Sequence, residues 1–199
     1  MYVKVCGLRE PEHVLAAVEA GADAVGFVIA SSPRQVTPDR ARALGAQVPP
    51  NVLTVAVFAG EPPDLIRAVA EQAGVRAVQL HGDYQPADFA ALADLPIRLI
   101  RAVSGEGQRD LRCGAFGEDM LIVDAPRPGS GQPWDWSRLA GRTAGRWLLA
   151  GGLHAGNVAA AVAAARPWGV DVSSGVESSR GVKDPTLIRR FVAAARAAG

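Results

Sequence analysis

Short apolar runs typical of β-strands recur eight times along the chain, and segments with helical periodicity separate most of them. The runs cover residues 2–6, 22–28, 52–58, 76–80, 97–103, 120–124, 146–150 and 169–173. Strands that alternate with helices in this way indicate a parallel α/β protein. Eight such units in 199 residues favour a (β/α)8 TIM barrel formed by one domain over residues 1–199. An open, doubly wound sheet is the alternative.

Helix start and stop signals support this pattern. Thr37 followed by Pro38 is typical of a helix N-cap and first turn, whereas Gly21 and Gly74 follow helical runs and predict their ends. The stretch 104–119 is the weakest candidate for a helix because glycines interrupt it.

Composition limits the classes of function. A formal net charge of +1 gives no reason to expect nucleic acid or a membrane surface as a partner. No leader-like segment and no long apolar run is apparent, so we expect a cytoplasmic protein. Two cysteines cannot form a disulfide framework, and three scattered histidines do not predict a metal site.

Side-chain alternation along the strands predicts which residues face the barrel interior. Apolar Val3 and Val5 should face the helices, which leaves Lys4 and Cys6 pointing inward. The same alternation places four more polar residues inside, at or near the carboxyl ends of strands: Gln79, His81, Asp124 and Asp171. Active sites of such barrels lie at this end, so these residues are candidates for a site.

Cys6 and Asp124 form the first candidate pair. Their strands are expected to lie across the barrel mouth, where a thiol and a carboxyl could serve as base and acid in proton transfer. The alternatives are a small buried apolar cysteine and a loop-capping aspartate. Lys4 and Asp171 face inward from the first and last strands, so we expect an ion pair between them. The Lys4 ammonium could also favour a thiolate at Cys6.

Two glycine-rich segments, at 148–157 and 171–179, follow the last two strands. Backbone N–H groups in such loops can converge on a phosphate, and this is the usual phosphate position in phosphate-binding barrels. Ordinary tight turns are the alternative.

Arg34, between two prolines after the second strand, could bind a carboxylate through its planar fork or could simply be solvated. The long loop within 124–136 could fold over a ligand, with Trp134 and Trp136 as anchors.

Together these motifs resemble the phosphoribosylanthranilate isomerase family. The resemblance rests on "KVCGL" (4–8), "SPRQVTP" (32–38), "VQLHG" (78–82), "LIVDAPRPGSGQPWDW" (121–136), "LAGGL" (149–153), "VDVSSGVE" (170–177) and "GVKD" (181–184). It implies an aldose–ketose isomerase of tryptophan biosynthesis that carries out an Amadori rearrangement without a cofactor. It also implies a small phosphorylated substrate and a monomer or homodimer.

The resemblance assigns roles to residues. It implies that Cys6 is the general base, Asp124 the general acid and Arg34 the partner of the anthranilate carboxylate. It places the phosphate at four residues of the glycine-rich loops: Gly152, Leu153, Ser174 and Gly175. Gln79, His81 and Asp171 are expected to contact the substrate as well. The alternatives are another phosphate-binding barrel enzyme, such as a pentose-phosphate epimerase or the indole-glycerol-phosphate synthase, and a non-catalytic binding protein.

Overall fold

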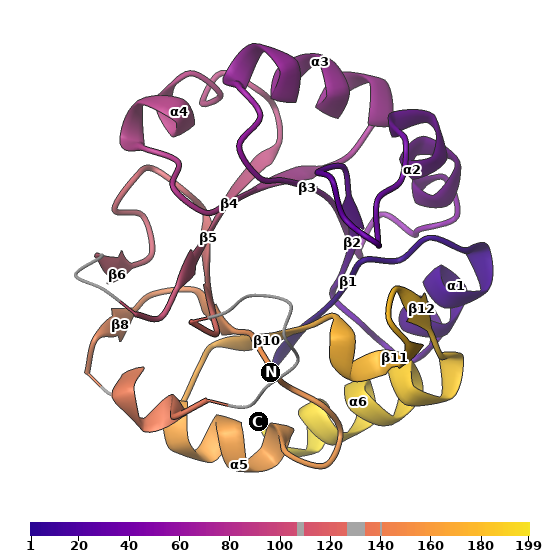
Figure 1. Ribbon diagram of the computed structural model, residues 1–199, viewed down its shortest axis with the longest axis vertical. Coiled ribbons are helices and arrows are strands. Elements are labelled where there is room, and N and C mark those ends of the chain that lie inside the picture. Colours follow the sequence, from indigo (N-terminus) through magenta and orange to yellow (C-terminus); the bar gives the residue numbers. More distant parts are fainter. Residues whose placement is uncertain (107–109, 127–133, 140) are drawn as a thin grey trace.

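Eight parallel strands close into a barrel in the computed structural model of the protein, which describes residues 1–106, 110–126, 134–139 and 141–199. Their order around the ring is β1-β10-β9-β7-β5-β4-β3-β2. Figure 1 looks along this ring and shows the helices outside it. Since β1 pairs with both β2 and β10, the predicted (β/α)8 barrel is confirmed and the open sheet is wrong.

The elements lie close to the predicted runs. The barrel strands are β1 (Tyr2–Cys6), β2 (Ala24–Val28), β3 (Leu53–Phe58), β4 (Ala77–His81), β5 (Arg98–Ser104), β7 (Met120–Asp124), β9 (Trp147–Leu149) and β10 (Gly169–Val172). The α-helices are α1 (Pro11–Glu19), α2 (Pro38–Gly45), α3 (Pro63–Ala73), α4 (Pro86–Ala90), α5 (Val158–Ala165) and α6 (Pro185–Ala197). Shorter elements are β6 (Leu111–Arg112), β8 (Thr143–Ala144), β11 (Glu177–Ser179), β12 (Val182–Lys183) and the 3-10 helices η1 (Trp136–Leu139) and η2 (Ser174–Val176).

The predicted helix signals act as expected. The Thr37 side chain accepts a hydrogen bond from the Arg40 amide at 3.2 Å and caps α2. Gly74 adopts a left-handed conformation, with φ of 62°, and ends α3. Among the described residues, no helix combines the length and apolar character needed to cross a bilayer.

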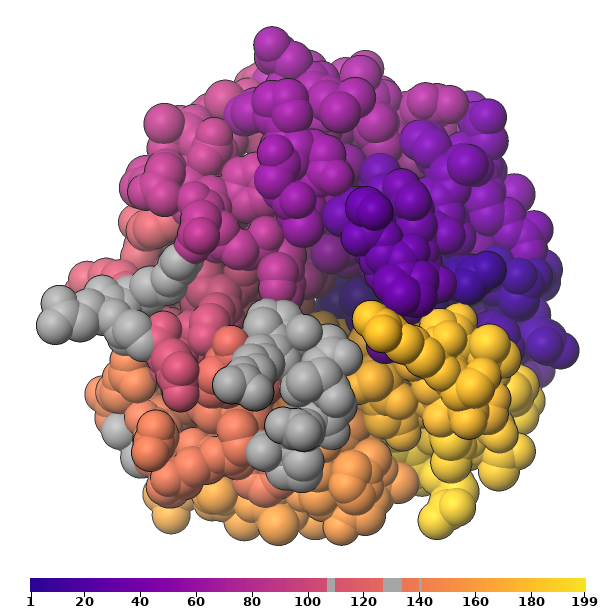
Figure 2. Space-filling view, viewed as in Figure 1, coloured from indigo at the N-terminus to yellow at the C-terminus, as the bar shows by residue number. Residues whose placement is uncertain are grey.

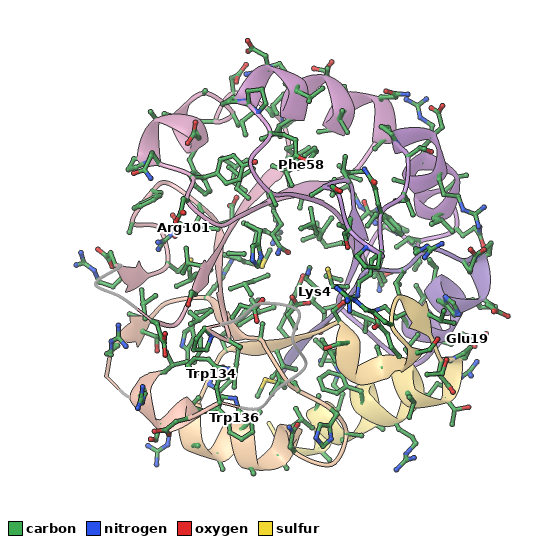
Figure 3. The ribbon with its side chains drawn as sticks, viewed as in Figure 1. Lys4, Glu19, Phe58, Arg101, Trp134 and Trp136 are labelled. Atoms are coloured by element: carbon green, nitrogen blue, oxygen red, sulfur yellow. The ribbon has the colours of Figure 1, made fainter. Side chains whose placement is uncertain are left out.

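Inward and outward faces of the strands follow the predicted alternation. Val3 and Val5 belong to the large apolar cluster between strands and helices, whereas Cys6 belongs to the smaller cluster inside the ring. Lys4 points into the barrel in Figure 3, while Phe58 lies on the outer side of β3. The prediction that polar side chains gather inside the barrel is confirmed for Lys4, Gln79 and Asp171, all of which are buried.

The segment after β5 does not form the helix considered for 104–119; in its described part it forms turns and β6. Gly114 and Gly117 have positive φ values that interrupt a helix. A buried ion pair holds this segment instead, with Arg101 Nε 2.7 Å from Glu118 Oε1. Arg101 also donates to the Arg112 carbonyl, and Glu118 accepts the Phe116 amide. This network therefore replaces the packing that a helix would supply.

We predict that Glu118→Ala lowers the free energy of unfolding by about 3 kcal/mol, because it leaves the Arg101 charge buried without its partner. Urea denaturation measures this change. Glu19→Gln is the control, since it removes an ion pair with Arg189 whose two side chains are half exposed. Equal effects of the two substitutions would contradict the importance of the buried pair.

Candidate active site

Cys6 lies at the carboxyl end of β1 and faces the barrel interior, with 7% of the residue exposed. Its neighbour in register on β2 is Gly26. A Cβ at Gly26 would lie 2.8 Å from the Cys6 sulfur, so the glycine makes room for the thiol. The neighbouring strand therefore helps to place the sulfur inside the ring.

Lys4 and Asp171 form the predicted ion pair, which joins β1 to β10. The Lys4 ammonium lies 3.0 Å from Asp171 Oδ1, and only 1% of the lysine side chain is exposed. Burial lowers the pKa of Lys4, but the charge of the Asp171 carboxylate and its hydrogen bond outweigh this effect and raise it, with an ionised Cys6 acting in the same direction. The lysine is therefore a permanent cation next to Cys6.

Burial raises the pKa of the Cys6 thiol above its ordinary value. Lys4 acts in the predicted direction and lowers this pKa, as Lys183 does, but the two ammonium groups do not overcome burial. The expected direction of the Lys4 effect is therefore confirmed, although burial outweighs it and leaves the pKa of Cys6 raised. Burial at the end of β1 keeps water from solvating the charged form of the sulfur.

Asp124 lies at the carboxyl end of β7, where Oδ1 accepts a hydrogen bond from the Ala125 amide at 2.7 Å. Burial raises the pKa of Asp124 to about 6; the Ala125 amide opposes this shift and Asp171 adds to it. Gly151 approaches closely, because a Cβ there would lie 2.7 Å from Asp124 Oδ1. Cys6 and Asp124 thus share Lys4 and Asp171 as electrostatic neighbours within one interior.

Gln79 and His81 both lie on β4 and complete the polar interior. Burial lowers the pKa of His81, so its imidazole is neutral at neutral pH. Gln79 is 3% exposed and its Oε1 has no hydrogen-bond partner within the described chain. A buried acceptor without a donor is costly, and a bound hydroxyl group could satisfy it. Among the described residues, no three histidine, cysteine or acidic side chains are grouped to hold a metal ion.

The two glycine-rich loops lie against each other, as a shared phosphate site requires. A Cβ at Gly175 would lie only 1.8 Å from the Leu153 carbonyl oxygen. Gly152 adopts a positive φ of 68°, and Asn157 holds the Gly152 carbonyl through a 2.8 Å hydrogen bond. The amides of Gly152 and Leu153 donate to no acceptor in the described part of the chain. These N–H groups are available to an anion.

Arg34 is only partly exposed and already binds a carboxylate of the protein itself. Its Nε and Nη2 donate to Glu177 at 2.6 and 3.0 Å, and Lys183 binds the same carboxylate. The sequence indicated no role for Glu177 or Lys183. The available signal was that Lys4 and Lys183 are the only lysines in the chain, beside 19 arginines.

The loop predicted within 124–136 lies partly outside the described residues, since 127–133 are not described. Trp134, at its end, donates to the Ala150 carbonyl at 3.2 Å. Its ring also covers Gly105, where a Cβ would lie 2.5 Å from the indole. The prediction that Trp134 is an anchor is confirmed.

A closed parallel barrel with titratable side chains at the carboxyl ends of its strands defines the class of (β/α)8-barrel enzymes. The family model described as N-(5'phosphoribosyl)anthranilate (PRA) isomerase matches residues 3–194. The chain belongs to the N-(5'-phosphoribosyl)anthranilate isomerase family, a family of aldose–ketose isomerases. This assignment confirms the predicted family over the epimerase and synthase alternatives.

Known relatives match nearly the whole chain. The N-(5'-phosphoribosyl)anthranilate isomerase of Desulforudis audaxviator is 41% identical over 202 residues and is covered to 98%, as is this chain. The crystal structure of TrpF from Jonesia denitrificans is 51% identical, with a TM-score of 0.91 over 100% of this chain and 98% of that chain. A phosphoribosyl anthranilate isomerase in complex with reduced 1-(o-carboxyphenylamino)-1-deoxyribulose 5-phosphate is 36% identical, with a TM-score of 0.86 and 99% of both chains covered.

We predict that Asp124→Asn stabilises the protein at neutral pH but not at pH 4. A carboxyl whose pKa is raised to about 6 in the folded state contributes stability below its ordinary pKa and loses it as the pH rises through 6. The free energy of unfolding of the variant should therefore exceed that of the wild type by about 2–3 kcal/mol at pH 8. Urea denaturation at both pH values measures the gap, and a gap that does not change with pH would contradict the raised pKa.

Proposed function

We propose that the protein converts N-(5'-phosphoribosyl)anthranilate to 1-(2-carboxyphenylamino)-1-deoxyribulose 5-phosphate in tryptophan biosynthesis by a cofactor-free Amadori rearrangement. Family membership over residues 3–194 carries this proposal. A related enzyme binds a reduced form of this product, and that enzyme covers 99% of this chain. The buried thiol of Cys6 and the half-buried carboxyl of Asp124, at the carboxyl ends of β1 and β7, are the two groups proposed for this reaction.

Asp124 is the proposed general acid and Cys6 the proposed general base. Asp124 gives its proton to the ribose ring oxygen, the ring opens, and a Schiff base forms between C1′ and the aryl nitrogen. Cys6 then takes the proton from C2′, which leaves an enolamine that tautomerises to the ketone. A pKa of about 6 supports the acid role, because Asp124 is more readily protonated near neutral pH than an ordinary aspartate.

The remaining residues are proposed to hold the two ends and the middle of the substrate. The phosphate is bound by the loops that contain Gly152, Leu153, Ser174 and Gly175, where the amides of Gly152 and Leu153 have no acceptor among the described residues. Arg34 binds the anthranilate carboxylate. Between them, Gln79, His81 and Asp171 face the sugar. Gln79 Oε1 has no donor within the described part of the chain, so a sugar hydroxyl is a suitable donor.

Turnover by matched cysteine variants tests the proposal. The wild type should consume the fluorescent anthranilate substrate, and Cys6→Ser should reduce kcat about a thousandfold because it removes the base. Cys113→Ser is the control, since Cys113 lies outside the barrel, where its sulfur is within hydrogen-bond distance of the carbonyls of Glu118 and Asp119. Failure of the wild type to turn over this substrate would overturn the proposed function. Full activity of Cys6→Ser would overturn the role of the thiol.

The pH dependence of kcat/KM tests the acid. Below pH 6 Asp124 is already protonated. As the pH is lowered further, kcat/KM therefore falls about tenfold per pH unit, because the thiolate fraction of Cys6 decreases. Above pH 6 the growing thiolate fraction and the shrinking carboxylic-acid fraction cancel, because the pKa of Cys6 is the higher. The kcat/KM of the wild type should therefore be flat from pH 6 up to the pKa of Cys6 and fall at higher pH.

Asp124→Asn should have about a thousandfold lower kcat/KM at pH 7. Its residual rate should keep rising with pH through 6, because the carboxyl that causes the plateau is gone. A plateau that begins near pH 6 in the variant as well would assign this titration to another group.

Gly175→Ala should weaken phosphate binding. Its Cβ would lie 1.8 Å from the Leu153 carbonyl oxygen, so the two loops must separate. We expect inorganic phosphate to inhibit at least about tenfold less strongly and the KM to rise accordingly. Gly45→Ala in α2 is the control, since its Cβ would meet no atom closer than 3.8 Å. Unchanged inhibition by phosphate would place the phosphate elsewhere.

A further inference from the structure

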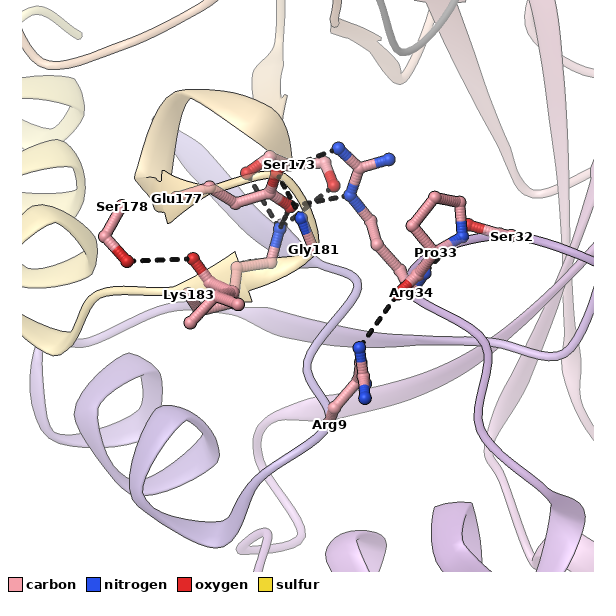
Figure 4. A network of polar contacts seen from close by, with 10 residues as sticks. Arg9, Ser32, Pro33, Arg34, Ser173, Glu177, Ser178, Gly181 and Lys183 are labelled. Carbon is pink, nitrogen blue, oxygen red and sulfur yellow. Dashed lines mark hydrogen bonds and ion pairs between the residues drawn. The ribbon is translucent and has the colours of Figure 1, made fainter.

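A buried network of polar side chains joins the loop after β2 to the hairpin formed by β11 and β12 (Figure 4). The Glu177 carboxylate is its centre. Oε1 accepts from Arg34 Nε at 2.6 Å and from Lys183 Nζ at 2.8 Å. Oε2 accepts from Arg34 Nη2 at 3.0 Å and from the Gly181 amide at 3.1 Å. These four donors use the full acceptor capacity of a carboxylate.

Lys183 is held as completely as Glu177. Its ammonium donates to the Ser173 carbonyl at 2.8 Å, to Ser173 Oγ at 3.1 Å and to Glu177, which uses all three N–H groups. The side chains of Lys183 and Glu177 are 1% and 5% exposed. Burial raises the pKa of Glu177, but hydrogen bonds from Arg34 and Lys183 outweigh it and lower the pKa to about 2. The Glu177 carboxylate is therefore ionised and is held through both of its oxygens.

The network lies directly against the end of β1. Gly7, which follows Cys6, has a φ of 78°, and a Cβ there would lie 2.8 Å from Arg34 Cδ, 3.2 Å from Ser173 Oγ and 3.4 Å from Lys183 Nζ. Across the same rim, a Cβ at Gly181 would lie 2.9 Å from the Pro33 carbonyl. Figure 2 shows yellow C-terminal residues in contact with indigo N-terminal ones on this face. The network is thus adjacent to the carboxyl end of β1, which carries the Cys6 thiol.

Arg34 retains donors for a ligand despite its ion pair. Within the described chain its Nη1 has no hydrogen-bond partner, because Glu177 uses only Nε and Nη2. An arginine in a loop has several freely rotating bonds, and ordering them on binding would reduce affinity. The bidentate contact removes that freedom beforehand. Two cations and one carboxylate also leave the network with a net charge of +1, which attracts an anion.

We propose that Glu177, held by Lys183, is a positioning residue that orients Arg34 toward the aryl carboxylate of the substrate and so makes the site selective for carboxylated N-aryl sugar phosphates. This proposal rests on the proposed function. It assigns no proton transfer to Glu177 or Lys183. It requires that loss of the Glu177 carboxylate affects only ligands that carry the aryl carboxylate.

Glu177→Gln tests the proposal, with Ser178→Ala in the same hairpin as the control. Ser178 is exposed, and among the described residues its hydroxyl donates only to the Val182 carbonyl, at 3.5 Å. Calorimetry would compare two probes: reduced 1-(o-carboxyphenylamino)-1-deoxyribulose 5-phosphate and the same compound with phenyl in place of carboxyphenyl. Glu177→Gln should raise the Kd of the first about tenfold and that of the second less than twofold. The KM should rise more than kcat falls.

Two results would overturn the proposal. Equal weakening of both probes would show a general loss of structure, and unchanged or tighter binding of the carboxylated probe would show that only net charge matters. Glu177→Asp provides a second variant if the first does not fold: it keeps the charge but shortens the reach, so the same selective loss is expected. Turnover by the wild type is measured separately from binding. If the wild type is inactive but the variant still loses affinity only for the carboxylated probe, the proposed function is rejected and the positioning role is retained.

Discussion

The buried ion pair between Lys4 and Asp171 is the interaction on which the barrel and its site both depend. The two residues are partners in register on β1 and β10, the first and last strands of the ring, and their charged groups lie 3.0 Å apart. A one-residue shift of either strand would turn its charge toward the apolar layer under the helices, where it would be unpaired and costly. The pair therefore helps to select the register in which the ring closes.

The same pair sets the electrostatics of the interior. Lys4 lowers the pKa of both Cys6 and Asp124, and Asp171 raises both, yet burial is the largest cause of shift at each group. Both groups are consequently biased toward their neutral, protonated forms. This bias suits Asp124 as an acid, because the acid must carry its proton. For Cys6 it means that the thiolate is a minor form but a strong base, because a poorly solvated thiolate has a high proton affinity. The buried acid also lowers stability at neutral pH, as is common at functional sites.

Local rules explain which parts could be predicted. Alternation along a strand requires only that one face packs on helices, so Lys4, Cys6 and Asp124 were placed inward correctly. The helix considered for 104–119 was wrong because Arg101 and Glu118, which are 17 residues apart, form a tertiary contact that periodicity does not report. The hairpin at Glu177–Lys183 was missed for a related reason, since its side chains are arranged by ion pairs across loops and not by an apolar face.

The chain's two lysines show what could have indicated the second network. All 19 other basic residues are arginines, yet the lysines at 4 and 183 are both buried, at 1% and 3% exposure. A compact ammonium with three donors fits a small cavity lined by oxygens, such as the one formed by Ser173 and Glu177, whereas a planar guanidinium needs a wider, flat opening. Both ammonium groups also lower the pKa of Cys6. In a chain that otherwise uses arginine, a lysine therefore indicates a confined cation, and here both confined cations lie near the same thiol.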